Sequence, residues 1–159
     1  MSSGETSSAE GERRLRPARP ADLPALVEVE QSSFEEPWTP ITLASELAFP
    51  GAQLWLEEGA DGRLAGYAAF RWDGFDGHLL RIAVPPALRR QGVASRLLGA
   101  GLGWLRGLGA ENCHLEVRAT NQPAIALYQR FGFGLAGRRS RYYSDGCDAL
   151  LFSLDLARP

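Results

Sequence analysis

A short turn rich in arginine and glycine is the first candidate for chemistry in this sequence. The range Arg89–Ala94 reads R-x-x-G-x-A, and it lies between a strand-like apolar run and a helix-like one. Glycine lets a ligand approach the backbone closely, and the unpaired N–H groups and dipole of a helix start favour an anion. The pattern predicts a seat for a pyrophosphate group. The alternative is an unliganded helix start whose arginines lie in solvent.

Prolines and apolar spacing predict the elements on either side of this turn. Leu79–Val84 is a buried-strand run, and Pro85 and Pro86 must end it because proline cannot donate to a β-ladder. A helix follows, with apolar or small residues three or four apart on one face: Leu97, Leu98, Gly101, Leu102, Leu105 and Leu108. We therefore expect Arg89–Ala94 to be the opening turn of that helix.

A carboxylate and a phenol further along the chain form the second candidate group. Asn112–Arg118 predicts a strand with Leu115 and Val117 on one face and His114, Glu116 and Arg118 on the other. Asn121 and Pro123 then start a helix that ends at Gly132, and its stripe is Ala124, Leu127, Tyr128 and Phe131. Glu116 is thus expected in mid-strand and Tyr128 on the next helix.

The other elements alternate between helix and strand signals. Arg13–Ala18 predicts a first strand, and Asp22 is expected to cap a helix carrying Leu23, Leu26, Val27 and Phe34. Thr39 and Pro40 start a second helix that runs to about Phe49. The remaining predicted strands are 52–58 and 63–72, joined as a hairpin, and then 134–143 and 149–156.

One glycine pattern is misleading. Gly132–Gly137 reads G-F-G-L-A-G and satisfies the dinucleotide-binding G-x-G-x-x-G pattern. A dinucleotide fingerprint follows a strand and opens a helix, whereas this segment follows a helix and opens a strand. We interpret it as a helix stop.

Length and composition limit the possible classes of protein. With 159 residues, 45% of them hydrophobic, the chain is expected to form a single domain at 13–159 after a small, polar, acidic and disordered leader at 1–12. All 17 basic residues are arginine, which excludes a Walker A lysine and Schiff-base chemistry. The net charge of -2 and the absence of a basic block argue against nucleic acid as a partner.

Cysteine and histidine usage argues against a metal site. Cys113, Cys147, His78 and His114 offer no spacing typical of metal ligands, so we expect no metal and reduced thiols. No apolar run approaches the ~20 residues that span a bilayer, and the N-terminus lacks the pattern of a signal peptide. A cytoplasmic protein without a membrane partner is expected.

The two candidate groups together resemble the GNAT superfamily of N-acetyltransferases, from about Arg13 to Leu156. In that superfamily R-x-x-G-x-A after a strand is the acetyl-CoA pyrophosphate motif. The sequence is most similar to the RimI-type ribosomal-protein-alanine acetyltransferases in four blocks: FEEPWT at 34–39, RIAV at 81–84, LEVRATN at 115–121 and RRSRYYSDG at 138–146. The resemblance implies an α/β GNAT fold with a mixed, mostly antiparallel sheet and helices on both faces.

The resemblance also implies a role for each candidate residue. Glu116 would be the general base and Tyr128 the general acid. The residues implied to bind acetyl-CoA are Ile82, Ala83 and Val84 at the pantetheine arm, Arg89, Arg90, Gln91, Gly92, Val93, Ala94 and Ser95 at the pyrophosphate, and Asn121. The implied substrate is the N-terminal alanine amine of a small-subunit ribosomal protein. The chemistry is reasonable in itself, because an ammonium must lose a proton before attack and a thiolate leaves more easily once protonated.

Several alternatives stay open at this point. Glu116 could pair with Arg118 or another arginine, Tyr128 could be core, His114 could be a rival base, and Trp38 could simply staple two helices. Pro85 stands where the family often has aspartate, and Ala94 replaces the commoner glycine. The glycines at 99, 101 and 103 weaken the predicted helix without an evident reason. The alternative functions are acetylation of a small-molecule amine and a catalytically silent acetyl-CoA-binding module.

The early part of the sequence also carries a charge asymmetry. Between Asp22 and Asp61 there are nine acidic residues and no arginine. We expect the two early helices and the Glu35-Glu36 loop to form a negative rim, which would suit a basic peptide, although a solvated surface explains the same run.

Overall fold

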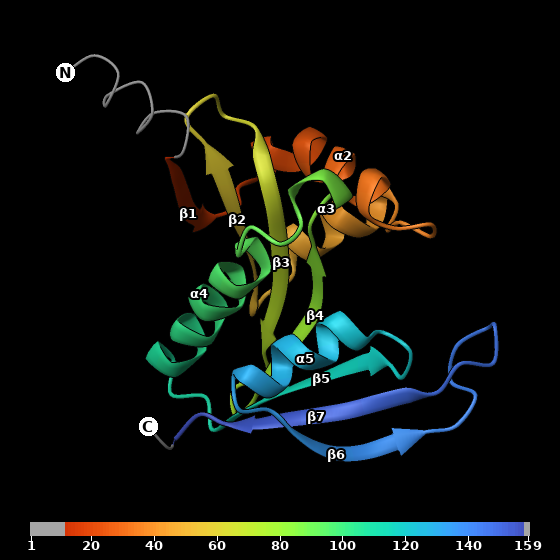
Figure 1. Cartoon of the computed structure of the whole chain (residues 1–159). Helices are drawn as coiled ribbons and strands as arrows, with labels where there is room; N and C mark the ends of the chain where they lie inside the picture. The colour runs from red at the N-terminus through yellow and green to blue at the C-terminus, as the bar shows by residue number, and fades with distance from the viewer. Residues whose placement is uncertain (1–11, 158–159) are drawn as a thin grey trace. The chain divides into compact units, whose positions relative to one another are not determined.

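The computed structural model of the chain describes residues 12–157 (Figure 1). Apart from Glu12, the leader predicted at 1–12 lies outside these residues. The chain divides into two compact units. One comprises the described residues up to Phe70 together with Arg81–Gly101, and the other comprises Arg71–Leu80 and the described residues from Leu102 onward.

In the first unit, a sheet is covered by helices. Strand β1 (Arg13–Pro17) pairs antiparallel with β2 (Ala52–Gly59), and β3 (Leu64–Trp72) and the end of β4 (Gly77–Ala83) follow in that order. The helices are α2 (Leu23–Ser33), α3 (Pro40–Ala48) and the start of α4 (Val93–Gly107), with short 3-10 turns η1 (Pro20–Asp22) and η2 (Pro86–Leu88). Figure 1 shows α2 and α3 beside each other.

Alternating residues of β3 show that helices cover both faces of this sheet. Tyr67 and Ala69 point into a core with Leu26 and Val29 of α2 and Leu43 of α3. The residues between them point the other way, because successive side chains of a strand alternate. Phe70, on that opposite face, packs against α4: a Cβ placed on Gly101 would lie 2.0 Å from the Phe70 ring. The glycine at 101 is therefore required for close helix–strand packing.

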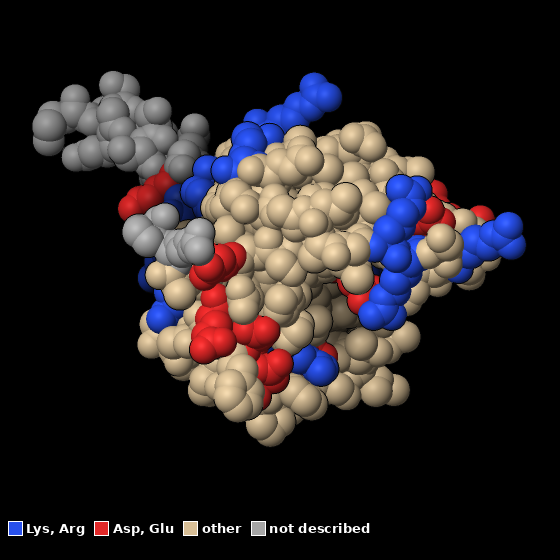
Figure 2. Space-filling view, turned by 90° about the horizontal axis from the view of Figure 1, so that it is seen from below, with Lys and Arg blue, Asp and Glu red and all other residues tan. Residues whose placement is uncertain are grey.

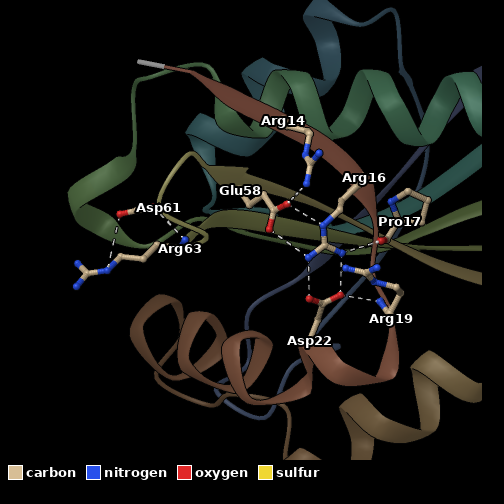
Figure 3. A network of polar contacts seen from close by, with 8 residues as sticks. All are labelled: Arg14, Arg16, Pro17, Arg19, Asp22, Glu58, Asp61 and Arg63. Atoms are coloured by element: carbon tan, nitrogen blue, oxygen red, sulfur yellow. Dashed lines mark hydrogen bonds and ion pairs between the residues drawn. The ribbon is translucent and has the colours of Figure 1, made fainter. Parts of the chain in front are cut away.

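An ion-pair network ties the first strands of this unit to η1 and α2 (Figure 3). Both guanidinium NH groups of Arg16 donate to Asp22, at 2.9 and 2.8 Å, while its Nε donates to Glu58 at 3.0 Å. Arg14 donates to the same Glu58 carboxylate at 2.9 Å. These bonds lower the pKa of Glu58 to about 2. The charged groups thus fix β1 and β2 to the start of α2.

The second unit is a sheet built around β5. Strand β5 (Asn112–Arg118) pairs parallel with the start of β4 and antiparallel with β7 (Ala149–Asp155), and β6 (Gly134–Arg139) pairs with β7. Helix α5 (Gln122–Arg130) begins at Asn121, whose side chain accepts from Ala124 N, and Gly132 ends it with φ 94°. The helix stop predicted within G-F-G-L-A-G is confirmed.

The structure corrects several predicted boundaries. Arg89–Ala94 is not the opening turn of a helix: φ is 65° at Arg90 and 79° at Gly92, which no α-helix accommodates, so α4 begins at Val93. The last turn also differs, since Leu108 follows α4 and is exposed. Strand β6 ends at Arg139 rather than Tyr143, shortly before Arg141 takes φ 51°. Phe34 follows α2 instead of lying within it.

Candidate active site

The candidate cofactor turn lies in the first unit, between η2 and α4. Ile82 and Ala83 end β4, and Val84 lies just past the strand, so the predicted pantetheine segment straddles the strand end. The first hydrogen bond of α4 joins Arg96 N to Gly92 O at 3.0 Å. The N–H groups of Val93, Ala94 and Ser95 come before that bond and are open to an anion.

The side chains of this turn offer fewer free hydrogen-bond donors than the sequence suggests. Arg89 is engaged with two carbonyls, Val84 O through Nε at 3.0 Å and Ser33 O through NH2 at 3.3 Å. The Gln91 side chain accepts from Arg13 at 2.9 Å. Arg90 is exposed, and its side chain forms no hydrogen bond or ion pair within residues 12–157. Among the two arginines of the motif, Arg90 is the one free to meet a phosphate.

A buried carboxylate holds the arginine that packs against this turn. It was not predicted from the sequence. Glu57 of β2 is 1% exposed and accepts two hydrogen bonds from Arg96, at 2.6 and 3.1 Å. Arg96 NH1 in turn lies 2.8 Å from the position that a Cβ on Gly92 would take. The guanidinium therefore packs against the glycine, and a side chain at 92 would displace it.

Glu116 lies in mid-β5, as predicted, with a carboxylate that is not buried in an ion pair. Its side chain is 37% exposed, and the nearest cation, Arg139 NH2, is 4.0 Å away. Arg118 does not pair with it: that guanidinium donates to Asp145 at 2.8 Å and stacks on Tyr143, 4.1 Å from the ring centroid. The predicted alternative of a pair with Arg118 is wrong, and a pair with another arginine is met only by the 4.0 Å contact with Arg139. A largely unneutralised carboxylate is able to accept a proton.

Tyr128 of α5 is buried, with 8% of its surface exposed. Burial raises the pKa of its hydroxyl to about 12, and the Cys113 thiol and Tyr143 add to the rise. Cys113 and Glu116 point to opposite faces of β5, since their positions differ by an odd number. Tyr143 also lies within electrostatic reach of Glu116, so the Tyr128 hydroxyl and the Glu116 carboxylate share this neighbour. The phenol is protonated at neutral pH, as a general acid must be.

His114, the rival base, has both ring nitrogens engaged. Nδ1 lies 2.6 Å from Ser153 Oγ and Nε2 lies 2.8 Å from Asp76 Oδ2. A histidine held at both nitrogens must break a hydrogen bond before it accepts a substrate proton. The geometry favours Glu116 over His114 as the base.

Asn121 and Trp38 each have a structural partner in the fold. The side chain of Asn121, expected to touch the cofactor, caps α5 by accepting from Ala124 N at 3.3 Å. Trp38 does more than staple helices, because its ring lies 4.9 Å from the Arg81 guanidinium and its backbone N donates to Glu30. The contact of Asn121 with a cofactor stays a prediction.

Tyr143 is a candidate that sequence reasoning missed. Burial and the charge of Glu116 raise the pKa of its hydroxyl, so the phenol lies within electrostatic reach of that carboxylate. The ring meets Tyr142 edge-on, with 5.2 Å between centroids. The only signal in the sequence is the tyrosine pair inside R-R-S-R-Y-Y-S-D-G, which does not say which ring turns inward.

The acidic stretch forms a smaller rim than predicted. Glu30 and Glu57 are buried against arginines, Asp22 and Glu58 share Arg16, and Glu46 is also buried. Within the stretch 22–61, the exposed acids that remain unpaired among the described residues are Glu28, Glu35 and Glu36. Figure 2 shows one face of the molecule, seen from below, where several acidic side chains gather in one group and others lie directly beside arginines.

The described residues hold neither a cluster of metal-binding side chains nor a membrane-spanning helix. No group of three or more His, Cys, Asp or Glu in 12–157 has the arrangement of a metal site. Within the same range, no helix is long and apolar enough to cross a bilayer. Cys113 is a free, buried thiol and Cys147 a free, partly exposed one.

Comparison with known proteins gives the class to which this fold and site belong. The chain belongs to the acetyltransferase (GNAT) family, whose family model matches residues 23–133. A relative from Bacillus subtilis, named a putative ribosomal protein bS18-alanine N-acetyltransferase, is 35% identical over 138 residues, which cover 86% of this chain and 91% of the relative. The ribosomal protein bS18-alanine N-acetyltransferase of Escherichia coli K12 is also 35% identical, over 139 residues that cover 86% of this chain and 93% of the relative.

A solved structure agrees with this assignment. The crystal structure of the ribosomal-protein-S18-alanine N-acetyltransferase from Escherichia coli matches with a TM-score of 0.84 and 32% identity, covering 91% of this chain and 94% of that chain. The predicted GNAT fold with a mixed sheet, the acetyltransferase class and the similarity to RimI-type relatives are confirmed.

Proposed function

We propose that this enzyme transfers the acetyl group of acetyl-CoA to the N-terminal alanine amine of a small-subunit ribosomal protein. The observation that carries the proposal is the identity of 35% with relatives named for that reaction, over 86% of this chain. The proposed reaction places the enzyme in the cytoplasm, with ribosomal protein as its partner, and needs no metal, nucleic acid or membrane.

The proposed chemistry assigns one proton transfer to each candidate residue. Glu116 takes a proton from the substrate ammonium, so that the amine lone pair can attack the thioester carbonyl carbon. The C–N bond forms, the C–S bond breaks, and Tyr128 gives its proton to the leaving CoA sulfur. The attacking nitrogen then loses its second proton, which returns the Tyr128 phenolate to the phenol, and Glu116 releases its proton to solvent. The products are an acetylated N-terminus and CoA. The open carboxylate of Glu116 and the protonated phenol of Tyr128 support these roles.

The cofactor would bind where the backbone is open. The N–H groups at the start of α4 and the free guanidinium of Arg90 suit a pyrophosphate, while Glu57 and Arg96 keep the turn in shape. A silent acetyl-CoA-binding module would need the turn alone. The presence of both Glu116 and Tyr128 favours the enzyme.

The test is a steady-state measurement of CoA release with two kinds of amine. We expect turnover with an arginine-rich peptide that begins with alanine, and at least about ten-fold lower kcat/KM with a polyamine. Faster turnover of the polyamine would favour the small-molecule alternative. Binding of acetyl-CoA without CoA release from either amine would favour the silent module.

A further inference from the structure

A fully buried carboxylate lies beneath the loop that joins α2 to α3. Glu30 of α2 is 0% exposed, and both of its oxygens are saturated with donors. Oε1 accepts from Arg81 NH2 at 2.9 Å and from Trp38 N at 2.7 Å. Oε2 accepts from Arg81 Nε at 2.8 Å and from the Tyr67 hydroxyl. The four donors come from β3, β4 and the loop, so this one side chain joins three separate segments to α2.

Arg81 extends the same network into the loop itself. Its guanidinium lies over the Phe34 ring at 3.7 Å and near the Trp38 ring at 4.9 Å from the centroids. Its NH2 also donates to the Glu36 carbonyl at 3.4 Å. The Arg81 side chain is 19% exposed, whereas Glu30 is completely enclosed. The arginine therefore stands between the core and the loop surface.

Segment 34–38 has no helix or strand of its own to hold it. Its ends are fixed by Arg89, which donates to Ser33 O at 3.3 Å, and by the Thr39 cap of α3. Between these ends the backbone hydrogen bonds of the segment lead to Glu30 and Arg81. A backbone without regular structure needs such partners to keep one conformation.

A buried ion pair is a poor way to gain stability, because desolvation offsets the attraction and well-packed apolar residues often serve as well. An apolar pair in these positions would fill the same space but would leave the Trp38 N–H and the Glu36 carbonyl without partners. What the charged pair adds is the fixed position of segment 34–38. The exposed carboxylates on that segment, Glu35 and Glu36, form no ion pair with any described residue.

We propose that Glu30 and Arg81 are positioning residues that hold the 34–38 loop in the shape that binds the acceptor peptide. They touch neither cofactor nor reacting atoms and act only through the loop, whose free carboxylates receive the basic peptide. This inference rests on the proposed function and names the part of the enzyme that sets affinity for the acceptor. The second buried pair, Glu57–Arg96, supports the cofactor turn instead.

The test compares substitutions in the two buried pairs. Glu30→Gln keeps the shape of the side chain but removes the charge that holds Arg81, and Arg81→Lys keeps the charge but loses the bidentate and stacked geometry. Each is expected to raise KM for an alanine-led, arginine-rich peptide about ten-fold, with the dissociation constant of acetyl-CoA unchanged. Glu57→Gln should instead raise the dissociation constant of acetyl-CoA and leave the KM for the peptide unchanged. Asp22→Asn, which disturbs only the Arg16 network, should lower the melting temperature and change neither constant.

A second measurement separates action through the loop from general destabilisation. In a Glu35→Gln/Glu36→Gln background, the loop has lost its charges, so adding Glu30→Gln should raise the peptide KM much less than it does in the wild type. Fully additive effects, or equal effects of Glu30→Gln on peptide and acetyl-CoA, would overturn the proposal. If the wild type fails to acetylate the peptide while releasing CoA with a polyamine, the proposed function itself is wrong.

Discussion

Glu116 combines two properties that a general base for an amine substrate needs: it is open to solvent and it is not neutralised by a close cation. Arg139 stands 4.0 Å away and Arg118 is turned to Asp145. Replacing the carboxylate by an amide preserves size and removes basicity. We expect Glu116→Gln to lower kcat by ~100-fold or more, since general base catalysis typically contributes that much.

Acetyl-CoA affinity is the control for this substitution. Calorimetry should give a dissociation constant close to that of the wild type, because the base acts on the amine and not on the cofactor. If Glu116→Gln kept nearly wild-type turnover at neutral pH, Glu116 would not be the general base. His114 would then be the next residue to replace, despite its bonds to Ser153 and Asp76.

For Tyr128, packing and catalysis compete for the same side chain. The ring is buried, and the Phe133 ring lies 5.8 Å from it. Tyr128→Phe removes only the hydroxyl, so the packing role survives the change. If the phenol protonates the thiolate, kcat should fall ~100-fold while the melting temperature changes little.

The result depends on the amine that is chosen as acceptor. The CoA thiol has a low pKa, so water can help the thiolate to leave, and a modest fall in kcat would be ambiguous. An acceptor of high pKa, assayed across the pH range in which the enzyme stays folded, gives the clearest reading. Turnover that equals the wild type throughout would leave Tyr128 with a core role only. The unfolding free energy should then change little, because the Tyr128 hydroxyl forms no hydrogen bond within residues 12–157 that the substitution would remove.

At the residue scale, the sequence predicts which side chains share a face of a strand or helix, because that depends on neighbouring residues. It does not predict ion pairs between residues that are far apart in the sequence. The positions of Glu116 on a strand and Tyr128 on a helix are predictable because both segments have clear periodicity. Their catalytic roles come from the family resemblance and stay predictions. Glu30 and Arg81 are missed because a glutamate on a helix reads as solvent-facing, and its partner is 51 residues away. The same distance effect hides the Arg118–Asp145 pair, whose partners lie 27 residues apart.

At the scale of elements, the glycines of α4 provide a matched pair for mutation. A Cβ on Gly101 would lie 2.0 Å from the Phe70 ring, whereas one on Gly103 would meet nothing within 4 Å. Gly101→Ala should therefore destabilise the protein by about 1–3 kcal/mol through overpacking. Gly103→Ala should instead stabilise it by up to ~1 kcal/mol, because alanine favours the helix.

Urea unfolding of both variants, compared with the wild type, measures this difference directly. The two substitutions add the same methyl group to the same helix, so opposite signs can come only from the surroundings. If Gly101→Ala were as stable as Gly103→Ala, the tight contact between α4 and Phe70 would be wrong.

The cofactor turn is the element whose charge is easiest to change. Arg90 is exposed, and among the described residues its side chain has no partner to lose. We expect Arg90→Glu to weaken acetyl-CoA binding, and to do so more at low salt, since it places a negative charge beside the proposed phosphate seat. An unchanged dissociation constant at low salt would mean that the phosphate binds elsewhere.

Element types were predictable here, but some boundaries were not. The strands at 13–17 and 112–118 and the helix caps at Thr39 and Asn121 follow from local residue preferences. The start of α4 does not, because the left-handed φ of Arg90 contradicts the usual preference of a side-chain-bearing residue. Asp22 stands at the N-cap position of α2 as predicted, yet its carboxylate bonds Arg16 and Arg19 N instead of capping that helix.

At the scale of the whole molecule, ionisable groups set a pH range of greatest stability. Paired carboxylates have lowered values: the pKa of Glu58 falls to about 2 through its bonds to Arg16 and Arg14, and that of Asp73 to about 2 through backbone N–H donors. A carboxyl group whose pKa is lower in the folded protein than in the unfolded chain stabilises the fold at every pH above its unfolded pKa. This stabilisation is lost as the pH falls from the unfolded pKa to the folded pKa. Melting temperatures should therefore decline from about pH 4.5 down to about 2.

Asp22→Asn is the variant that tests the acid side, because it removes one of the two carboxylates that bind Arg16. The pKa of Asp22 is lowered mainly by its hydrogen bonds from Arg16. The wild type should therefore be more stable than the variant at neutral pH, and the gap should narrow as pH falls below the unfolded pKa. A gap that stayed constant with pH would mean that the Arg16 network contributes nothing through ionisation.

The alkaline limit comes from buried groups that resist losing a proton. Burial raises the pKa of the Cys113 thiol to about 12 from the model-compound value of 9.0, and that of Tyr128 to about 12 from 10.0. A group whose pKa is higher in the folded protein than in the unfolded chain stabilises the fold fully at any pH below its unfolded pKa. This stabilisation disappears as the pH rises through the folded pKa. We therefore expect melting temperatures to fall from about pH 9 upward.

Cys113→Ala tests this alkaline limit without depending on how much the substitution itself destabilises. The variant lacks the thiol, so its stability carries no contribution that vanishes between pH 9 and about 12. The cavity that it leaves costs stability equally at every pH, since no charge is involved. The melting-temperature gap between wild type and variant should therefore be constant up to about pH 8 and shrink steadily above pH 9. Parallel curves up to pH 11 would mean that the folded protein ionises Cys113 as readily as the unfolded chain does, and that the thiol is not enclosed.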